Sequence, residues 1–174
     1  MSNQSLRTND CVDEVIEKYA DMVYRLAFSR VKNKNDADDI FQEVFLRYIK
    51  NEREFETEEH RKAWLIRVTI NCSNSFFSSA WIQKVVPIAE TEPDPYEGPE
   101  ELGLHEVLME LPVKYRTVLH LFYYEDLPIN EIGRILKRKP ATVKTQLMRA
   151  RQMLKEKLKG DLYENIPCPD EIYE

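Results

Sequence analysis

Apolar residues recur at steps of three and four along most of this chain, the spacing that gathers side chains on one face of an α-helix. The first series consists of Val12, Val15, Ile16, Tyr19, Met22, Val23, Leu26 and Ala27. After the polar interruption KNKND, Asn35 is the expected N-cap of a second helix at about residues 36 to 50. The side chains that this helix is expected to bury are Ile40, Val44, Phe45 and Tyr48, with Phe41 at their edge.

A third helix is expected after the polar loop NEREFET. Thr57 suits its N-cap, and Glu58 and Glu59 suit the positive end of its dipole. Its apolar positions are Trp64, Leu65, Val68 and Cys72. We interpret Trp64 as an anchor in the core, and the three helices as one small domain at residues 10–84.

Four further helical segments are expected in the C-terminal part of the chain. The first is the range Glu100–Leu111, and Pro112 is expected in the first turn of the second. Pro128 leads into the short segment INEIGRIL, and Pro140 begins the longest helix of the four. The apolar face of that helix consists of Val143, Leu147, Ala150, Leu154 and Leu158. No strand pattern is convincing, so the sequence predicts an all-α fold with a second helical domain at residues 100–160.

The segment between the two domains, residues 85–99, is acidic and interrupted by proline and glycine. From Val85 to Val113 there is no Lys or Arg, whereas eight acidic residues accumulate. We interpret the segment as a flexible linker, for which a solubilising spacer is the simplest role. The last residues, 161–174, form an acidic tail that is expected to be disordered.

Charge is distributed unevenly along the chain. The 174 residues carry a net charge of -6, yet ten bases and only one acid lie between Arg134 and Lys159. The other residues hold 15 bases and 30 acids. Such a cluster indicates that one surface binds a polyanion and that the rest of the molecule does not.

Composition excludes several classes of protein. Hydrophobic residues make up 43% of the chain, which argues against global disorder. No apolar run approaches the roughly 20 residues that span a bilayer, so we expect no membrane insertion. The scattered cysteines, Cys11, Cys72 and Cys168, favour the reducing cytoplasm and predict neither a disulfide framework nor a metal site. No phosphate loop, zinc-ligand spacing or nucleophile elbow indicates an enzyme or a cofactor.

The last two helices have the pattern of a helix-turn-helix motif, in which the second helix enters a major groove. With Val143 and Leu147 in the core, the outward residues of the N-terminal half of that helix are Lys144, Thr145, Met148 and Arg149. Arg offers paired donors to guanine, Gln146 suits adenine, and Thr or Met contacts a thymine methyl. The other bases suit phosphate contacts. A solvated basic helix face is the alternative interpretation.

Three segments carry a resemblance to a known family: DADDIFQEVFLRYIK, AWLIRVTIN and LPVKYRTVLHLFYYEDLPINEIGRILKRKPATVKTQLMRARQMLKEKL. In this order they resemble the bacterial RNA polymerase sigma factors of the extracytoplasmic function (ECF) group of the sigma-70 family. The resemblance covers about residues 10 to 160. It implies a region 2 domain of three to four helices, a region 4 helix-turn-helix domain, and promoter-specific transcription initiation without active-site chemistry in this chain.

The resemblance also implies where the partners bind. The segment DADDIFQEVF corresponds to the helix that docks on the clamp helices of the largest subunit of core RNA polymerase, and the polymerase flap is a further contact. The residues nominated for the clamp are Asp38, Asp39, Gln42, Glu43 and Phe45. From the residues alone, the alternative interpretation is that these acids have no partner protein and merely solvate the N-terminus of their own helix.

Promoter DNA is the second implied partner. In RVTIN, Asn71 corresponds to the asparagine that contacts a base extruded from the melted -10 element, and an amide can both donate to and accept from a base edge. The basic helix corresponds to the reader of the -35 element. Its nominated residues are Arg138, Lys139, Thr142, Lys144, Thr145, Gln146, Met148, Arg149 and Arg151.

The linker and the regulation also follow from the resemblance. The linker would thread through the active-site cleft and RNA exit path of the polymerase, where its acids would occupy a basic path until nascent RNA displaces them. An anti-sigma factor that covers the polymerase-binding surface is a further implied partner.

This sequence departs from the family pattern at two places. The stretch CSNSFFSSAWIQK, after Asn71, has only Lys84 where the family is rich in bases, which weakens the expected grip on DNA phosphates. In the turn of the helix-turn-helix, Lys137 and Arg138 replace small and apolar residues, and Lys139 replaces the usual hydroxyl N-cap. The loss of such a cap costs roughly 1 kcal/mol.

Two rival functions stay open at the level of the sequence. A stand-alone helix-turn-helix regulator would bind an operator tightly without core polymerase, whereas a sigma factor acquires specificity only with it. A helical adaptor that binds protein alone would show no steep salt dependence of DNA binding.

Overall fold

The computed structural model describes residues 6–7, 11–51, 53–83 and 102–158. Contacts between Cα atoms divide the chain into two compact units, Met1–Glu92 and Pro93–Glu174. The expected linker at 85–99 and tail at 161–174 lie outside the described residues, as does Cys168.

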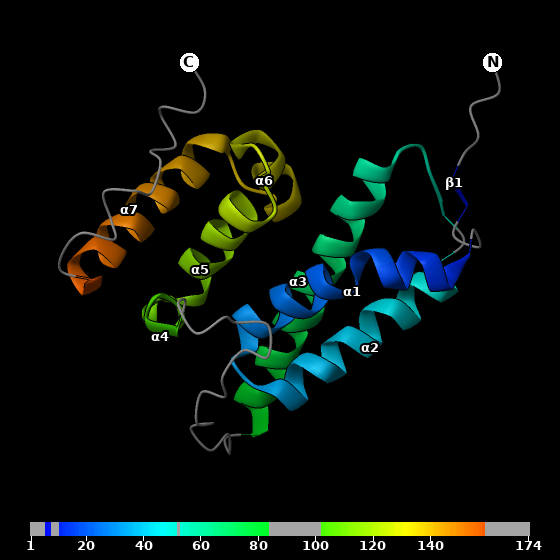
Figure 1. Ribbon diagram of the computed structural model, residues 1–174, viewed down its shortest axis with the longest axis horizontal. Helices are drawn as coiled ribbons and strands as arrows, with labels where there is room; N and C mark the ends of the chain where they lie inside the picture. The colour runs from blue at the N-terminus through cyan, green and yellow to red at the C-terminus, as the bar shows by residue number, and fades with distance from the viewer. Residues whose placement is uncertain (1–5, 8–10, 52, 84–101, 159–174) are drawn as a thin grey trace. The chain divides into compact units, whose positions relative to one another are not determined.

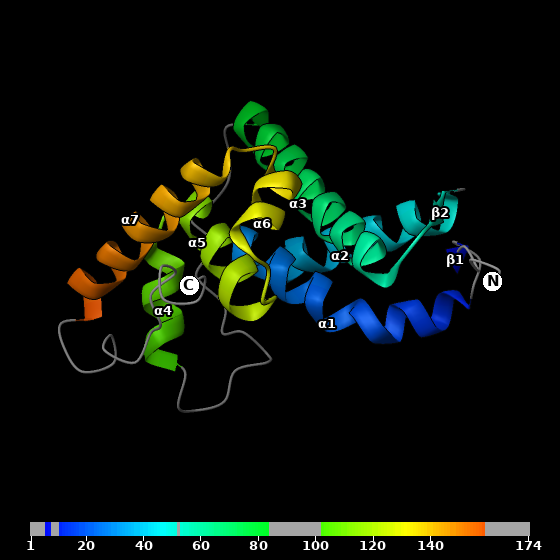
Figure 2. The same ribbon diagram turned by 90° about the horizontal axis from the view of Figure 1, so that it is seen from above.

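The N-terminal unit is built from three helices: α1 (Val12–Val31), α2 (Lys34–Lys50) and α3 (Glu58–Gln83). All three pack against one another, and α3 crosses both of the others (Figures 1 and 2). Their apolar stripes meet in a core whose largest fully buried side chains are Val23, Leu26, Phe28, Val44, Tyr48, Leu65 and Ile66. The predicted helical periodicity is therefore confirmed in this unit.

Two short strands also occur in this unit, although the sequence predicted none. β1 (Leu6–Arg7) pairs antiparallel with β2 (Glu54–Phe55). Phe55 is buried, and its ring centroid lies 6.3 Å from that of Tyr48 and 5.8 Å from that of Trp64. Strands of two residues are too short to leave an alternating pattern, so the prediction missed them.

The start of α2 differs from the prediction by two residues. Its N-cap is Asn33, which has an extended backbone and whose Oδ1 accepts a hydrogen bond from the Asp36 N–H at 3.1 Å. The prediction of Asn35 as the cap was wrong, because α1 ends at Val31 and its C-cap, Lys32, is left-handed, so the chain has already turned when it reaches Asn33. Thr57 does cap α3, as predicted, since its Oγ1 accepts from the His60 N–H at 3.2 Å.

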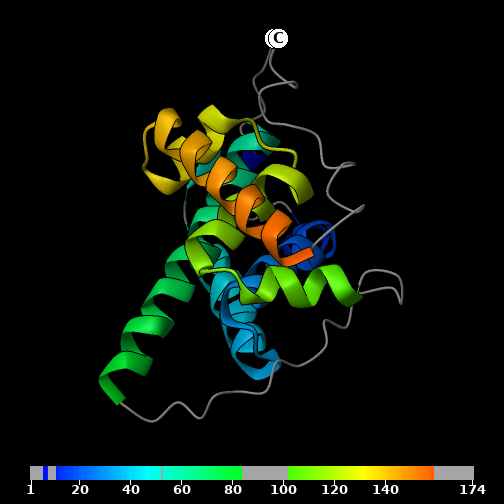
Figure 3. The same cartoon turned by 90° about the vertical axis from the view of Figure 1, so that its left-hand side faces the viewer.

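The C-terminal unit contains α4 (Leu102–Glu110), α5 (Val113–Leu119), which continues into the π-helical turn η1 (His120–Tyr124), α6 (Ile129–Leu136) and α7 (Pro140–Leu158). α7 packs against α4, α5 and α6 (Figure 3). Pro112 is the N-cap of α5 and so precedes the first turn in which it was expected.

Arg116 joins α4 to α5 inside this unit. Its buried guanidinium donates to the carbonyl oxygens of Met109, at 3.3 Å, and of Leu111, at the C-terminal end of α4, where carbonyl groups have no partner within the helix. Burial lowers the pKa of Arg116 to about 10. The side chain therefore provides hydrogen bonds to carbonyl groups at the C-terminal end of α4 from inside the unit.

With seven α-helices and two two-residue strands among the described residues, the all-α prediction is confirmed. Within the same ranges, no helix is both long and apolar enough to cross a membrane. The described side chains also contain no group of three or more His, Cys, Asp or Glu residues that could hold a metal ion.

Candidate nucleic-acid interface

The turn between α6 and α7 brings the two helices into a helix-turn-helix arrangement. Lys137 ends α6 in the left-handed conformation, with φ 54° and ψ 48°. The Arg138 N–H donates to the Gly133 carbonyl at 2.8 Å, and the Lys137 N–H donates to the Arg134 carbonyl at 3.3 Å. These two bonds are the pair that defines a Schellman motif, which usually has glycine at the left-handed position.

Gly133 makes this tight turn possible. A Cβ atom added to it would lie 2.8 Å from the carbonyl oxygen of Arg138. The backbone of the turn can approach α6 this closely only because residue 133 has no side chain. The close approach directs the chain into α7, which begins at Pro140. At this start the carbonyl oxygen of Lys139 accepts hydrogen bonds from the N–H groups of Thr142 and Val143, at 2.9 and 3.2 Å.

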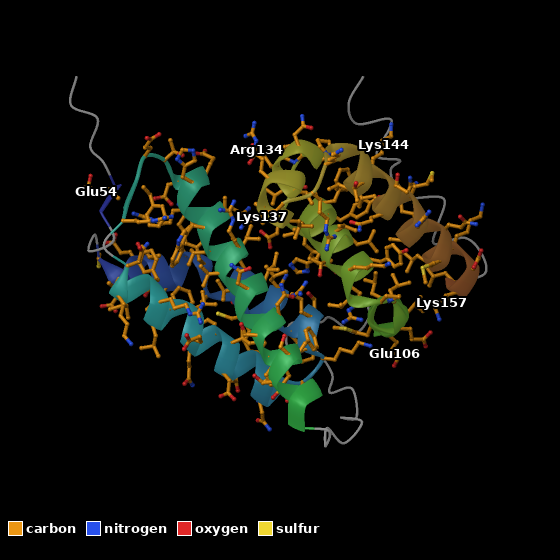
Figure 4. The ribbon with its side chains drawn as sticks, turned by 180° about the vertical axis from the view of Figure 1, so that it is seen from behind. Glu54, Glu106, Arg134, Lys137, Lys144 and Lys157 are labelled. Carbon is orange, nitrogen blue, oxygen red and sulfur yellow. The ribbon has the colours of Figure 1, made fainter. Side chains whose placement is uncertain are left out.

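The predicted outward face of α7 is exposed. Val143, Leu147, Ala150 and Leu154 are buried against the rest of the unit. Lys139, Thr142, Lys144, Met148 and Arg149 are exposed, and Met148 retains 60% of its accessible surface. Arg138, Thr145, Gln146 and Arg151 are half-buried. Figure 4 labels Arg134, Lys137 and Lys144 on α6, the turn and α7.

Two of the predicted DNA contacts bind each other. The Arg138 guanidinium donates to Gln146 Oε1 at 2.8 Å and so ties the turn to the second turn of α7. The bidentate contact of an amide with adenine uses both its oxygen and its nitrogen. Gln146 can therefore make that contact while it keeps the bond to Arg138 only if its oxygen accepts two hydrogen bonds at once.

A depression of about 310 Å³ lies between the start of α5 and the N-terminal half of α7. It gathers four of the predicted residues, Thr142, Thr145, Gln146 and Arg149. Lys114 and Tyr115 complete its lining together with Ala141. Lys114 was not among the predicted contacts, although the signal was present: it is the first base after the acidic segment and lies two residues after Pro112, the N-cap of α5.

On α3, Asn71 is exposed between the buried side chains of Ile70 and Cys72. Arg67 is also exposed, one helical turn earlier, and was not predicted. Its signal was the spacing of four residues, which places it on the same face as Asn71. It supplies a cation on the N-terminal side of Asn71, whereas residues 72–79 contain none.

The serines that follow Asn71 bond to their own helix. Ser75 donates to the carbonyl of Asn71 at 3.1 Å, Ser78 to that of Asn74 at 3.1 Å, and Ser79 to that of Ser75 at 3.0 Å. This pattern is common for hydroxyls inside a helix. Here it leaves the amides of Asn71 and Asn74 and the rings of Phe76 and Phe77 as the larger groups on this part of α3.

On α2, four of the five residues nominated for the polymerase are accessible. Asp39, Gln42 and Glu43 are exposed and Asp38 is half-buried. Phe45 is only 5% exposed, and its ring centroid lies 4.8 Å from that of Phe41, so its side chain packs in the core on the inner face of α2. The nomination of Phe45 as a surface contact disagrees with this burial.

The same outer face of α2 exposes two large apolar residues that were not predicted from the sequence. Leu46 and Ile49 keep 48% and 50% of their accessible surface. Leu46 follows Gln42 by four residues and Ile49 follows Leu46 by three, so both continue the face of Gln42. Exposed apolar side chains next to polar ones are typical of a protein-binding surface.

The fold and these surfaces together define a class: a two-unit helical protein with one helix-turn-helix unit and one three-helix unit that exposes apolar residues on α2 and an asparagine on α3. Comparison with known families agrees with this class. Residues 15–82 match Sigma-70 region 2, and residues 101–154 match Sigma-70, region 4.

Curated relatives extend over most of the chain. RNA polymerase sigma factor SigV of Bacillus subtilis (strain 168) is 35% identical over 146 residues, which cover 80% of this chain and 86% of SigV. ECF RNA polymerase sigma factor SigM of the same organism is 31% identical over 155 residues, which cover 83% of this chain and 93% of SigM. The chain belongs to the ECF group of RNA polymerase sigma factors, so the predicted family is confirmed.

A solved structure has the same fold. The sigma factor RpoE, in a co-crystal with the anti-sigma factor NepR from Bartonella quintana, matches with a TM-score of 0.69 at 19% identity. The match covers 86% of this chain and 97% of that one.

Proposed function

We propose that this chain directs core RNA polymerase to promoters, with separate helices for the polymerase, the -10 element and the -35 element. The observation that carries the proposal is the presence of regions 2 and 4 on one chain, each with an exposed helix of the expected chemistry. The chain itself supplies recognition, and nucleotide addition belongs to the polymerase. Its place of action is the cytoplasm, where core polymerase works.

The outer face of α2 is the proposed contact with the clamp helices of the largest polymerase subunit. Leu46 and Ile49 supply apolar area, while Asp38, Asp39 and Gln42 supply hydrogen-bonding groups. An apolar centre with a polar rim is the usual composition of such an interface. The C-terminal unit is the proposed partner of the polymerase flap.

The same α2 face is the proposed target of an anti-sigma factor. The structurally similar sigma factor RpoE was crystallised with its anti-sigma factor NepR, which supports a partner of this kind. A protein that covers Leu46 and Ile49 would keep the chain from the polymerase. Competition between that protein and core polymerase for this chain is the expected result.

For DNA, we propose that Asn71 contacts a base of the melted -10 element and that α7 enters the major groove of the -35 element. The exposure of Asn71, Lys144 and Arg149 supports these roles. The remaining residues proposed for the -35 element are Arg138, Lys139, Thr142, Thr145, Gln146, Met148 and Arg151. Lys114 adds a cation at the rim of the depression, where it suits a backbone phosphate.

The decisive experiment is in vitro transcription with purified core polymerase on fragmented genomic DNA, with the start sites mapped by sequencing. We expect start sites to share two sequence elements only when this chain is present. The chain alone should bind the same fragments weakly and without sequence preference. Tight, sequence-specific binding by the chain alone would instead identify a stand-alone regulator.

A further inference from the structure

Asn74 on α3 is held by a buried arginine from another helix. Arg30, in the last turn of α1, is only 6% exposed, and its Nη2 lies 2.7 Å from Asn74 Oδ1. Asn74 itself is exposed. The contact therefore joins a buried, charged donor to the oxygen end of an exposed amide, and so it fixes the orientation of that amide as well as joining two helices.

This contact determines which end of the Asn74 amide faces outward. A guanidinium has only donors and no acceptor, so only the amide oxygen can face it. A hydrogen bond from a charged donor is about twice as strong as one between neutral groups. The Asn74 Nδ2 group, with its two N–H donors, is therefore the end that remains for a ligand.

Asn74 is also placed beside the proposed base contact. It follows Asn71 by three residues, and side chains at this spacing are neighbours on a helix surface, about 5–6 Å apart at Cβ. The distance suits two adjacent contacts along one stretch of melted strand. Asn71 has no comparable arginine among the hydrogen bonds of the described residues.

We propose that Asn74 is a second specificity residue of the -10 element, which selects a keto base, thymine or guanine, next to the base bound by Asn71. This inference rests on the proposed function. Thymine O4 and guanine O6 accept hydrogen bonds, whereas the amino groups of adenine and cytosine donate them. An amide whose oxygen faces Arg30 turns its two N–H donors outward. At the 4 or 6 position of a base, these donors pair with the keto oxygen of thymine or guanine and oppose the amino group of cytosine or adenine. Arg30 is a positioning residue in this arrangement.

Asn74→Asp tests the proposal because it keeps the bond to Arg30 and reverses the outward polarity. Oδ1 still accepts from Arg30, and the outward atom becomes an acceptor, which favours adenine or cytosine. Asn74→Ala removes the contact altogether. Ser79→Ala is the matched control, since Ser79 is exposed on α3 and bonds only to the carbonyl of Ser75 in the described structure.

The assay is transcription by the holoenzyme on double-stranded promoter fragments whose -10 element is randomised, with the transcribed templates sequenced. For the wild type we expect a keto preference at one position beside the position that responds to Asn71→Ala. Asn74→Asp should shift that preference towards amino bases by about tenfold or more, the size of one base contact. Asn74→Ala should flatten that position alone, and Ser79→Ala should change nothing.

Two outcomes would overturn the inference. One is an unchanged set of base preferences in both Asn74 variants. The other is a uniform loss of transcription at every sequence, which would assign Asn74 a structural role or a phosphate contact. If the wild-type holoenzyme shows no promoter preference at all, the proposed function fails first, so the two failures are distinguishable.

Discussion

At the scale of single residues, Glu58 is the point where polar contacts between α1 and α3 converge. Its Oε2 accepts from the Tyr19 hydroxyl at 2.6 Å and from Lys18 at 3.1 Å, and its Oε1 accepts from Arg61 at 2.7 Å. Partial burial by itself raises the pKa of Glu58, but these hydrogen bonds and the charge of Arg61 outweigh it and lower the pKa. The pKa of the Tyr19 hydroxyl is raised, mainly by burial and secondly by its hydrogen bond to Glu58.

We expect Glu58→Gln to lower the free energy of unfolding of the N-terminal unit by about 1–2 kcal/mol near neutral pH. Because the pKa of Glu58 is lowered in the folded state, its stabilisation is complete above the unfolded-state pKa and is lost as pH falls through the folded-state pKa. The gap between wild type and variant should therefore narrow in acid.

Urea unfolding followed by tryptophan fluorescence measures this gap, since both tryptophans, Trp64 and Trp81, belong to α3. Glu56→Gln is the control, because the Glu56 side chain is 87% exposed and lies 3.9 Å from His60. A gap that stays constant from neutral to acidic pH would contradict the prediction.

Gly133 gives a second prediction at this scale. Helix propensity alone predicts that Gly133→Ala would stabilise α6 by about 0.8–1 kcal/mol. The added Cβ would lie 2.8 Å from the Arg138 carbonyl oxygen, so we expect the opposite sign, a loss of about 1–3 kcal/mol. Thermal unfolding followed by circular dichroism decides the sign, with Gln152→Ala on the exposed side of α7 as the control.

At the scale of elements, α2 has two apolar sets that differ in exposure. Its inner set, which includes Val44, Phe45 and Tyr48, is buried, while Leu46 and Ile49 are exposed. Helical periodicity predicted the inner set correctly. That set includes Phe45, which is 5% exposed, so its nomination as a polymerase contact, which rested on the family resemblance alone, disagrees with both the periodicity and the structure.

We expect Leu46→Asp to weaken binding to core polymerase at least tenfold without changing the unfolding midpoint, because Leu46 is 48% exposed and packs little in the free chain. Surface plasmon resonance with immobilised core polymerase measures the affinity. Asp21→Ala, on the exposed side of α1, should leave it unchanged. Equal affinity of Leu46→Asp and wild type would remove the α2 face from the proposed interface.

The α6–turn–α7 element shows how far sequence patterns predict a site. Spacing predicted that Val143 and Leu147 are buried and that Lys144 and Arg149 are exposed, and the structure confirms this burial pattern. Spacing did not predict the bond between Arg138 and Gln146, because the two residues belong to different elements and meet only after the turn closes.

At the scale of the whole molecule, the chain carries two units, each with a core of its own. The units resemble domains that fold separately. Tryptophan occurs only in the N-terminal unit, so its fluorescence reports one unit while circular dichroism reports both.

We expect substitutions in the two cores to act independently. Phe45→Ala should destabilise the N-terminal unit by about 3–5 kcal/mol and lower the fluorescence midpoint in urea. Leu147→Ala should destabilise the C-terminal unit by about 2–5 kcal/mol and change the circular dichroism transition alone. A fluorescence midpoint that moves with Leu147→Ala would show that the units unfold together.

The sequence by itself determined the helical fold class, the family and the position of the basic cluster, because each depends on the order and local spacing of residues. Tertiary structure alone decided which side chains from distant segments meet. Arg30 and Asn74 are 44 residues apart in sequence and meet only where α1 packs on α3. Leu46 stays 48% exposed for the same reason: burial depends on neighbours that distant segments supply.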